Sequence, residues 1–249
     1  TSSFGAGALP GAIVGLGYGL ATWQALTGFN MELGSAYSEE LAKAGIDLTD
    51  ADQIVEGLRN PEIIAKAKVF QQGSEALDLG ETATSFVLPN QHGKSISLDD
   101  LLKNGPVVVT FYRGSWCPYC NLQLRALQAR LGDIHALGAQ LVAISPQVPD
   151  ESLTKDEISA MEFYVLSDQN ATVAAQYGVA WQVPEFLSEH MRVDRKLDLD
   201  VINNGNGSIL PIPATFVIGR DGIVKWRFVD VDYRTRSEPD DIIEALKCL

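Results

Sequence analysis

The sequence predicts an α/β fold built on a mainly parallel sheet with an antiparallel edge. From residue 81 onward, apolar β-rich runs alternate with segments of helical pattern. Near the C-terminus two such runs, 214–218 and 223–229, flank a Gly-Arg-Asp-Gly turn. Strands that alternate with helices form parallel sheets, whereas a tight glycine-containing turn joins antiparallel strands. With 249 residues, 46% of them hydrophobic, the chain is long enough for one substantial domain and an extension.

The individual elements follow from local pattern. Short runs of Val, Ile, Leu and Phe between turn residues predict strands, and apolar residues at helical spacing predict helices. The expected strands are 85–89, 94–98, 106–112, 139–145, 164–167, 214–218 and 223–229. The expected helices are 118–131, a segment near 150–160, 171–177 and 240–246. Residues 181–210, which include Asn-Asn-Gly-Asn-Gly, interrupt this alternation, and we expect them to form an insertion.

Residues 1–30 are an uncharged, Gly-rich apolar segment in which Gly7, Gly11, Gly15 and Gly19 recur every four residues. On a helix these glycines form a smooth ridge that lets a second helix approach closely in lipid. Twenty residues of helix span about 30 Å, the hydrocarbon thickness of a bilayer. Three interpretations stay open: a helix that spans or packs within a membrane, an arm packed on a partner chain, and the remnant of a signal peptide. The first is preferred.

The chain divides into three parts, 1–30, 31–77 and 78–249. The middle part predicts a helical extension with helices at 35–44, 50–59 and 61–72, serving as a lid or spacer. The chain starts with Thr rather than Met, so we expect a processed N-terminus of the kind that suggests an organelle. Together with the apolar segment, this predicts membrane association and a membrane protein complex as a partner. The alternative is a soluble intracellular protein.

Composition excludes several classes of function. The net charge is −13 and the chain has no block of Lys or Arg, so we expect no nucleic-acid partner. Three cysteines are too few for a disulfide-stapled scaffold. The histidines, His92, His135 and His190, are scattered without ligand spacing, so we expect neither a metal site nor a metal cofactor. No other cofactor is expected.

The run Phe-Tyr-Arg-Gly-Ser-Trp-Cys-Pro-Tyr-Cys at 111–120 follows a buried strand and opens a helix. This places Cys117 at a helix N-terminus, where unpaired N–H groups and the helix dipole stabilise a thiolate. Cys120 lies one turn further on, near enough to close a disulfide, and Arg113 adds positive charge. The spacing therefore predicts a reversible dithiol pair in which Cys117 attacks first. The alternatives are two inert buried thiols or half of a zinc site.

Residues 78–249 resemble the alkyl hydroperoxide reductase / thiol-specific antioxidant family, in its peroxiredoxin-like branch on the thioredoxin fold. The resemblance rests on the segments 111–127, 142–147, 166–168, 211–218 and 232–239. It implies a thioredoxin-like fold and an antioxidant enzyme that reduces hydroperoxides or disulfides. An external thiol reductant of the thioredoxin or glutathione type would restore the dithiol. Trp116 belongs to the shared motif and is counted with the site residues. Pro213 matches the proline that is cis in thioredoxin-fold enzymes and packs beside the cysteines; the alternative is an ordinary trans proline.

Two alignments of the motif disagree about the attacking sulfur. Aligned on Phe-Tyr, Cys120 falls on the peroxidatic cysteine of the family, Cys117 replaces a Thr or Ser that hydrogen-bonds the peroxide, and Arg113 replaces a Pro. Aligned on Trp-Cys, the motif is that of thioredoxin and glutaredoxin, and Cys117 is the nucleophile. We therefore expect a thiol-dependent redox protein that uses Cys117 and Cys120 on peroxides or disulfides. The alternative function is a structural or accessory subunit of a membrane complex, anchored by residues 1–30.

The resemblance suggests roles for three further residues. Arg234 or Arg236 is a candidate for the cationic partner found in peroxiredoxins, but a surface position is the preferred expectation for both. Cys248 stands next to the C-terminus, where some peroxiredoxins carry a cysteine that resolves across subunits. A free surface thiol is the preferred expectation for it.

Overall fold

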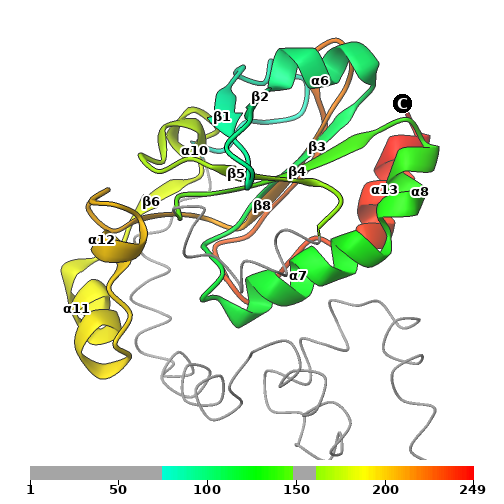
Figure 1. The fold of residues 1–249 in the computed structure, drawn as a ribbon. Coiled ribbons are helices and arrows are strands. Elements are labelled where there is room, and N and C mark those ends of the chain that lie inside the picture. Colours follow the sequence, from blue (N-terminus) through cyan, green and yellow to red (C-terminus); the bar gives the residue numbers. More distant parts are fainter. Residues whose placement is uncertain (1–74, 148–160) are drawn as a thin grey trace, which may run out of the picture.

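The computed structural model describes residues 75–147 and 161–249 (Figure 1). Its centre is a five-stranded sheet in the order β5-β4-β3-β8-β9. β3 pairs in parallel with β4 and β4 with β5, whereas β8 is antiparallel to both β3 and β9, which confirms the predicted parallel centre and antiparallel edge. The strands are β3 (Val107–Phe111), β4 (Gln140–Ser145), β5 (Tyr164–Ser167), β8 (Ala214–Ile218) and β9 (Val224–Val229).

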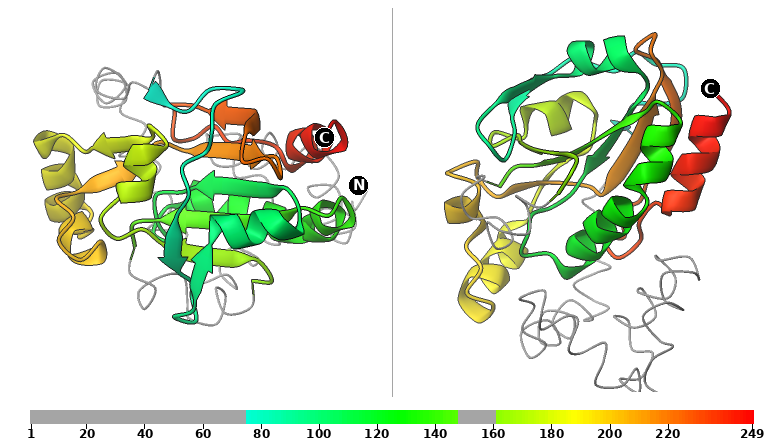
Figure 2. Two further views of the ribbon diagram at one scale, coloured as in Figure 1. Left: turned by 90° about the horizontal axis from the view of Figure 1, so that it is seen from above. Right: turned by 45° about the vertical axis from the view of Figure 1, so that its right-hand side comes forward.

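One face of the sheet is covered by α7 (Pro118–Ala129), α8 (Leu131–Ala136) and α13 (Pro239–Lys247). The last two lie side by side at one end of the sheet (Figures 1 and 2). Apolar side chains of α7 and α13, such as Leu124 and Ile242, pack with Val108 of β3 on this face. The opposite face packs against α6 (Leu98–Asn104), α10 (Thr172–Gln176) and the hairpin of β1 (Val87–Pro89) and β2 (Ser95–Ser97). All five residues of β3 are buried because both faces are covered, which explains why four of the five are apolar.

The insertion at 181–210 has structure that the sequence pattern did not reveal. It contains β6 (Ala180–Gln182), α11 (Glu185–Asp194), α12 (Leu199–Ile202) and β7 (Ile209–Pro211). β6 and β7 pair antiparallel, and β7 leads directly into β8. In Figures 1 and 2 the insertion lies at the other end of the fold from α8 and α13. β6, α12 and β7 are only three or four residues long, too short for a periodic pattern to predict them. The Asn-Asn-Gly-Asn-Gly run lies in the loop between α12 and β7.

Two helical segments also differ from expectation. The helix expected over 118–131 is two helices, because Arg130 leaves helical geometry (φ −107°, ψ 9°) between α7 and α8. The helix α6 was missed, since the apolar residues that begin it continue the pattern of the preceding strand. Its first turn carries Asp99 and Asp100, whose negative charge suits a helix N-terminus.

Several expectations concern residues outside the described part of the chain. They are the apolar segment 1–30, the helices expected at 35–44, 50–59 and 61–72, and the helix near 150–160. Within residues 75–147 and 161–249, no helix is both long enough and apolar enough to cross a bilayer.

The entry into the parallel pair β3–β4 depends on a close approach of two backbones. A Cβ atom added to Gly105, just before β3, would lie 1.9 Å from the carbonyl oxygen of Gly138, just before β4. We predict that Gly105→Ala lowers the free energy of unfolding by about 1–3 kcal/mol, the usual cost of overpacking. Gly132→Ala is the matched control, because nothing lies within 4 Å of its added Cβ and it stands in α8. It should be neutral or stabilise by up to about 1 kcal/mol. Urea denaturation measures both, and equal effects would contradict this account.

Candidate active site

The loop that carries the cysteines begins where β3 ends. The N–H of Tyr112 donates to the carbonyl of Ile144 (2.9 Å), which keeps the chain on the sheet for one more residue. The loop then turns at Gly114, whose φ of +142° is uncommon for residues with a Cβ. Cys117 is the N-cap of α7, and its N–H donates to the carbonyl of Gly114 (3.2 Å). The expected strand–loop–helix arrangement is therefore present (Figure 1).

A buried amide holds this loop in place. Oε1 of Gln147, two residues after β4, accepts hydrogen bonds from the backbone N–H of Ser115 (2.7 Å) and from its hydroxyl (2.9 Å). The side-chain amide of Asn121, in α7, donates to the carbonyl of the same serine (2.7 Å). The hydroxyl of Ser167 in turn donates to the carbonyl of Gln147 (2.6 Å). The loop is thus tied to two strands and to its own helix.

Both sulfur atoms are reduced and almost wholly buried, with 3% of Cys117 and none of Cys120 exposed. One guanidinium lies close to both thiols. Nη2 of Arg236 lies 3.3 Å from Sγ of Cys120 and 3.9 Å from Sγ of Cys117. The two thiols also hydrogen-bond each other. The sulfur pair and the arginine therefore form one electrostatic unit.

The two thiols have opposite pKa shifts. Burial raises the pKa of Cys117 most strongly, and its hydrogen bond with Cys120 and the charge of Cys120 raise it further. At Cys120 burial also opposes ionisation. It is outweighed by the hydrogen bond from Cys117, the charge of Arg236, the backbone N–H of Arg113 and a hydrogen bond from Arg236, so that the pKa falls to about 5. The opposite directions of the two pKa shifts, together with the shorter distance from Arg236 to Cys120, favour a single thiolate on Cys120.

This result reverses the sequence-based expectation that Cys117 is the thiolate. A position at the helix N-terminus does favour an anion, but only modestly. The buried sulfur of Cys117 accepts no capping hydrogen bond from its helix, and the guanidinium is nearer to Cys120. Burial and the distance to the cation outweigh the helix dipole here.

A chain of buried hydroxyls positions Arg236. The hydroxyls of Thr110 and Thr215 lie 3.0 Å apart across β3 and β8, and that of Ser237 lies 2.9 Å from Thr215. Nε2 of Gln123, in α7, donates to the Ser237 hydroxyl (3.2 Å). The residue after Arg236 is thereby fixed to the sheet and to the helix that carries Cys120.

The two candidate arginines, Arg234 and Arg236, have different partners. Arg236 lies half-buried at the thiols and also donates to the carbonyls of Tyr233 and Thr235, so a surface role was the wrong expectation for it. Arg234 instead forms two hydrogen bonds to the carboxylate of Asp232, at 2.8 and 2.7 Å. The sequence pattern alone could not tell these neighbours apart.

Arg113 is a second cation of the site and is only 4% exposed. Its guanidinium carbon lies 5.8 Å from the ring centroid of Trp116, 5.6 Å from that of Trp181 and 4.9 Å from that of Tyr233. Burial lowers the pKa of Arg113, while the negative charge of Cys117 and Cys120 acts in the other direction. We call these three rings the aromatic box. Trp181 reaches it from β6 of the insertion, and no feature of the sequence had marked it as a site residue.

The expectation that Pro213 is cis was wrong. The described residues contain no cis peptide bond. Between β7 and β8, the N–H of Ile212 donates to the carbonyl of Val179 (2.7 Å). Pro213 is buried and stands one residue before Ala214, which pairs with Phe111 in the sheet register. It therefore lies at the same end of strands β3 and β8 as the start of the cysteine loop.

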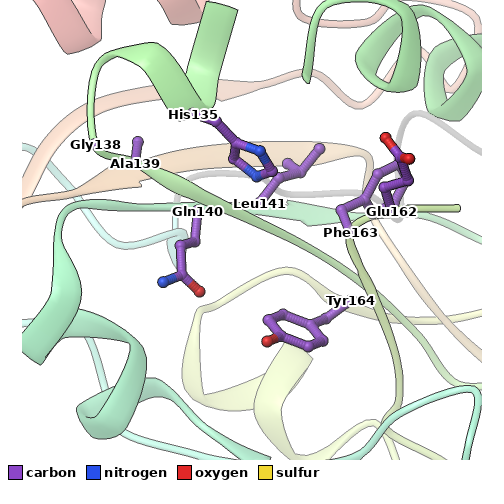
Figure 3. Close-up of a pocket in the computed structure, with 8 residues that line it drawn as sticks. All are labelled: His135, Gly138, Ala139, Gln140, Leu141, Glu162, Phe163 and Tyr164. Atoms are coloured by element: carbon purple, nitrogen blue, oxygen red, sulfur yellow. The ribbon is translucent and has the colours of Figure 1, made fainter. Parts of the chain in front are cut away.

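Other candidate features lie away from the thiols. A surface pocket of about 400 Å³ is lined by His135, Gln140, Glu162 and Tyr164, among others (Figure 3). It lies where β4 and β5 begin, at the opposite end of these strands from the cysteine loop. Cys248 is a free, exposed thiol that caps α13. In the parts of the chain that are described, no group of three or more His, Cys, Asp or Glu side chains could hold a metal ion.

Comparison with known proteins finds the same group of proteins by family model, by sequence and by structure. The model of the AhpC/TSA family matches residues 79–227. Peroxiredoxin Bcp of Escherichia coli is 26% identical over 171 residues, which cover 69% of this chain and 96% of that protein. The crystal structure of peroxidoxin BcpB from Mycobacterium tuberculosis is 25% identical, with a TM-score of 0.54 over 70% of this chain and 98% of that one. A peroxiredoxin-like protein from Aquifex aeolicus, 15% identical, has the same fold, with a TM-score of 0.54 over 69% of this chain and 87% of that one.

The arrangement of charges predicts the pH profile of thiol reactivity. In the unaltered protein, the rate of alkylation by iodoacetamide should rise with pH through a midpoint near 5, because the thiolate is the reactive form. Arg236→Gln removes the cation at the sulfurs and should raise this midpoint by about 1–3 pH units.

Arg234→Gln is the matched control, because Arg234 is paired with Asp232. Its midpoint should stay within about 0.3 units of the unaltered protein, the level expected for a charge outside the sulfur contacts. Equal midpoints for the two variants would show that Arg236 does not stabilise the thiolate.

Proposed function

The chain belongs to the AhpC/TSA family, and on this basis we propose that it is a thiol-dependent peroxidase in which Cys120 attacks a hydroperoxide and Cys117 resolves the product. The observation that carries the proposal is the position of Arg236, whose guanidinium lies 3.3 Å from the Cys120 sulfur. A cation at this distance stabilises the thiolate and stands where negative charge develops when an O–O bond breaks.

The first step follows from the charge on Cys120. Its thiolate attacks the distal oxygen of the hydroperoxide, so that an S–O bond forms and the O–O bond breaks. The sulfur becomes a sulfenic acid, and the alkoxide takes a proton from solvent to leave as an alcohol. Arg236 stabilises the charge that moves onto the leaving oxygen.

The second step belongs to Cys117. Its thiol attacks the sulfenic sulfur, which forms the Cys117–Cys120 disulfide and releases water. Two equivalents of a monothiol such as glutathione, or one dithiol of the thioredoxin type, then reduce the disulfide. That reaction returns the Cys120 thiolate and the Cys117 thiol and releases one proton, which balances the proton taken up in the first step.

Cys117 has two tasks in this scheme. The family places a hydroxyl residue at its position, and here the thiol supplies the hydrogen bond to Cys120 instead. Unlike a hydroxyl, a thiol can also form the disulfide. Cys117 therefore combines the donor and the resolving cysteine in one residue, and Cys248 has no role in the cycle.

A second candidate is reduction of disulfides without peroxide turnover. The observation in its favour is the Cys-Pro-Tyr-Cys sequence, with Pro118 in the first turn of α7, as in thioredoxin-like reductases. No described feature favours the structural membrane subunit, because residues 1–30 lie outside both the described residues and the family match at 79–227.

Peroxide consumption with added thiol, followed by mass mapping, tests the proposal. Cys120→Ser should abolish turnover and leave no sulfenic acid for a trapping reagent. Cys117→Ser should still form the sulfenic acid but no intramolecular disulfide, because it lacks the resolving thiol. Cys248→Ser is the control and should keep full activity, since this exposed thiol stands at the C-terminal end of α13, whereas Arg236 precedes that helix.

Two results would overturn the proposal. If Cys117→Ser blocks sulfenic acid formation and Cys120→Ser permits it, the order of attack is the reverse. If the unaltered protein reduces disulfides but consumes no peroxide, the second candidate is correct.

A further inference from the structure

Arg113 is a buried cation without a carboxylate partner among the described residues. The groups whose charges act on it are Cys117, Cys120, Tyr233 and Arg236. Of these, only the thiol pair supplies a negative charge at neutral pH, because burial keeps Tyr233 protonated by raising its pKa. A buried guanidinium is normally paired with an anion. Among the described residues, the anion that acts on Arg113 is the thiolate of the cysteine pair.

The charge of the site therefore depends on its oxidation state. In the reduced state the two guanidiniums of Arg113 and Arg236 face one thiolate, so the site carries a net charge of about +1. In the oxidised state the disulfide is neutral, and both guanidiniums lose their counter-ion. Charges in a buried site interact more strongly than in water, so this change affects the stability of the two states unequally.

We propose that Arg113 is a fixed counter-charge for the Cys120 thiolate that destabilises the Cys117–Cys120 disulfide relative to the dithiol, and so makes the disulfide easy for an external thiol to reduce. This inference rests on the proposed function, because it requires that the two cysteines form a disulfide. Arg113 acts through the sulfurs and is a positioning residue.

The aromatic box explains how the cation can persist without a carboxylate. The faces of Trp116, Trp181 and Tyr233 attract the guanidinium without neutralising it. A carboxylate in their place would cancel the positive charge at the sulfurs in both oxidation states. The rings therefore keep Arg113 folded into the site while its charge remains available to the thiolate. This also gives a function to the insertion, because β6 supplies Trp181.

The reaction that Arg113 would bias is thiol–disulfide exchange with the reductant. Two glutathione molecules give two electrons to the disulfide and become oxidised glutathione. The protein sulfurs become the Cys120 thiolate and the Cys117 thiol, and one proton is released. Stabilising the thiolate shifts this equilibrium toward the reduced protein.

The equilibrium with glutathione tests the inference in the full chain. Arg113→Met removes the charge, fills the aromatic box with an apolar side chain of similar length, and keeps the backbone N–H that donates to Cys120. We expect its disulfide to be at least about tenfold harder to reduce than that of the unaltered protein, the effect of a thiol pKa change of about one unit. The midpoint of its thiolate titration should rise in parallel.

Two further variants serve as controls. Arg113→Lys keeps a positive charge and should stay within about threefold of the unaltered protein at pH 7, a difference small beside one pKa unit. Arg234→Gln, which alters a cation already paired with Asp232, should leave the equilibrium unchanged. Equal equilibria for Arg113→Met and the unaltered protein would overturn the inference.

If Arg113→Met does not fold, Arg113→Lys provides the test. Burial lowers the pKa of an ammonium, so this variant should lose its charge at high pH and become harder to reduce there, whereas an arginine keeps its charge. The ratio of the equilibrium constants of this variant and the unaltered protein should therefore change between about pH 6 and pH 10, the range over which a buried lysine can titrate. A constant ratio would overturn the inference.

Because oxidised glutathione forms the disulfide directly, these measurements need no peroxide. Failure of peroxide turnover would refute the proposed function alone, and an unchanged equilibrium would refute the inference alone.

Discussion

The rest of the site depends on the cost of burying a negative charge at Cys120. The sulfur is fully buried, and burial alone would keep it protonated. Three donors compensate this cost: the thiol of Cys117, the backbone N–H of Arg113 and the guanidinium of Arg236. Each comes from a different local structure, namely a helix cap, a strand-to-helix loop and the segment before α13. The fold can therefore be understood by how it brings these three groups to one atom.

The sheet and its hydroxyl chain do most of this positioning. β3 delivers Arg113 and the cysteines at its end, and β8 lies next to it in the sheet. Thr110 and Thr215 face each other across this pair and continue through Ser237 to α7. The guanidinium and the sulfur that it stabilises are thus fixed to the same two strands. Because each hydroxyl in the chain is buried and paired, displacement of any one would leave a polar group without its partner.

Local sequence was sufficient for what depends on local physics. The apolar run of β3, the turn and the helix start around Pro118 all follow from short-range preferences, and so did the placement of the two thiols. The pKa order of the thiols, the position of Arg236 and the contribution of Trp181 did not. Each depends on contacts between residues more than 60 positions apart, such as the 116 positions between Cys120 and Arg236. No periodicity records such contacts, and helix-terminus reasoning failed because it lacked the cation.

The coupling between the two cysteines also orders the proposed reaction. While Cys120 is a thiolate, its charge and its hydrogen bond hold Cys117 protonated, since both raise the pKa of Cys117. A protonated thiol is a poor nucleophile, so Cys117 does not compete for the peroxide. Conversion of Cys120 to a neutral sulfenic acid removes that charge, while Arg236 and Arg113 remain and now favour ionisation of Cys117. The first step thereby activates the residue required for the second, and the same two arginines serve each sulfur in turn.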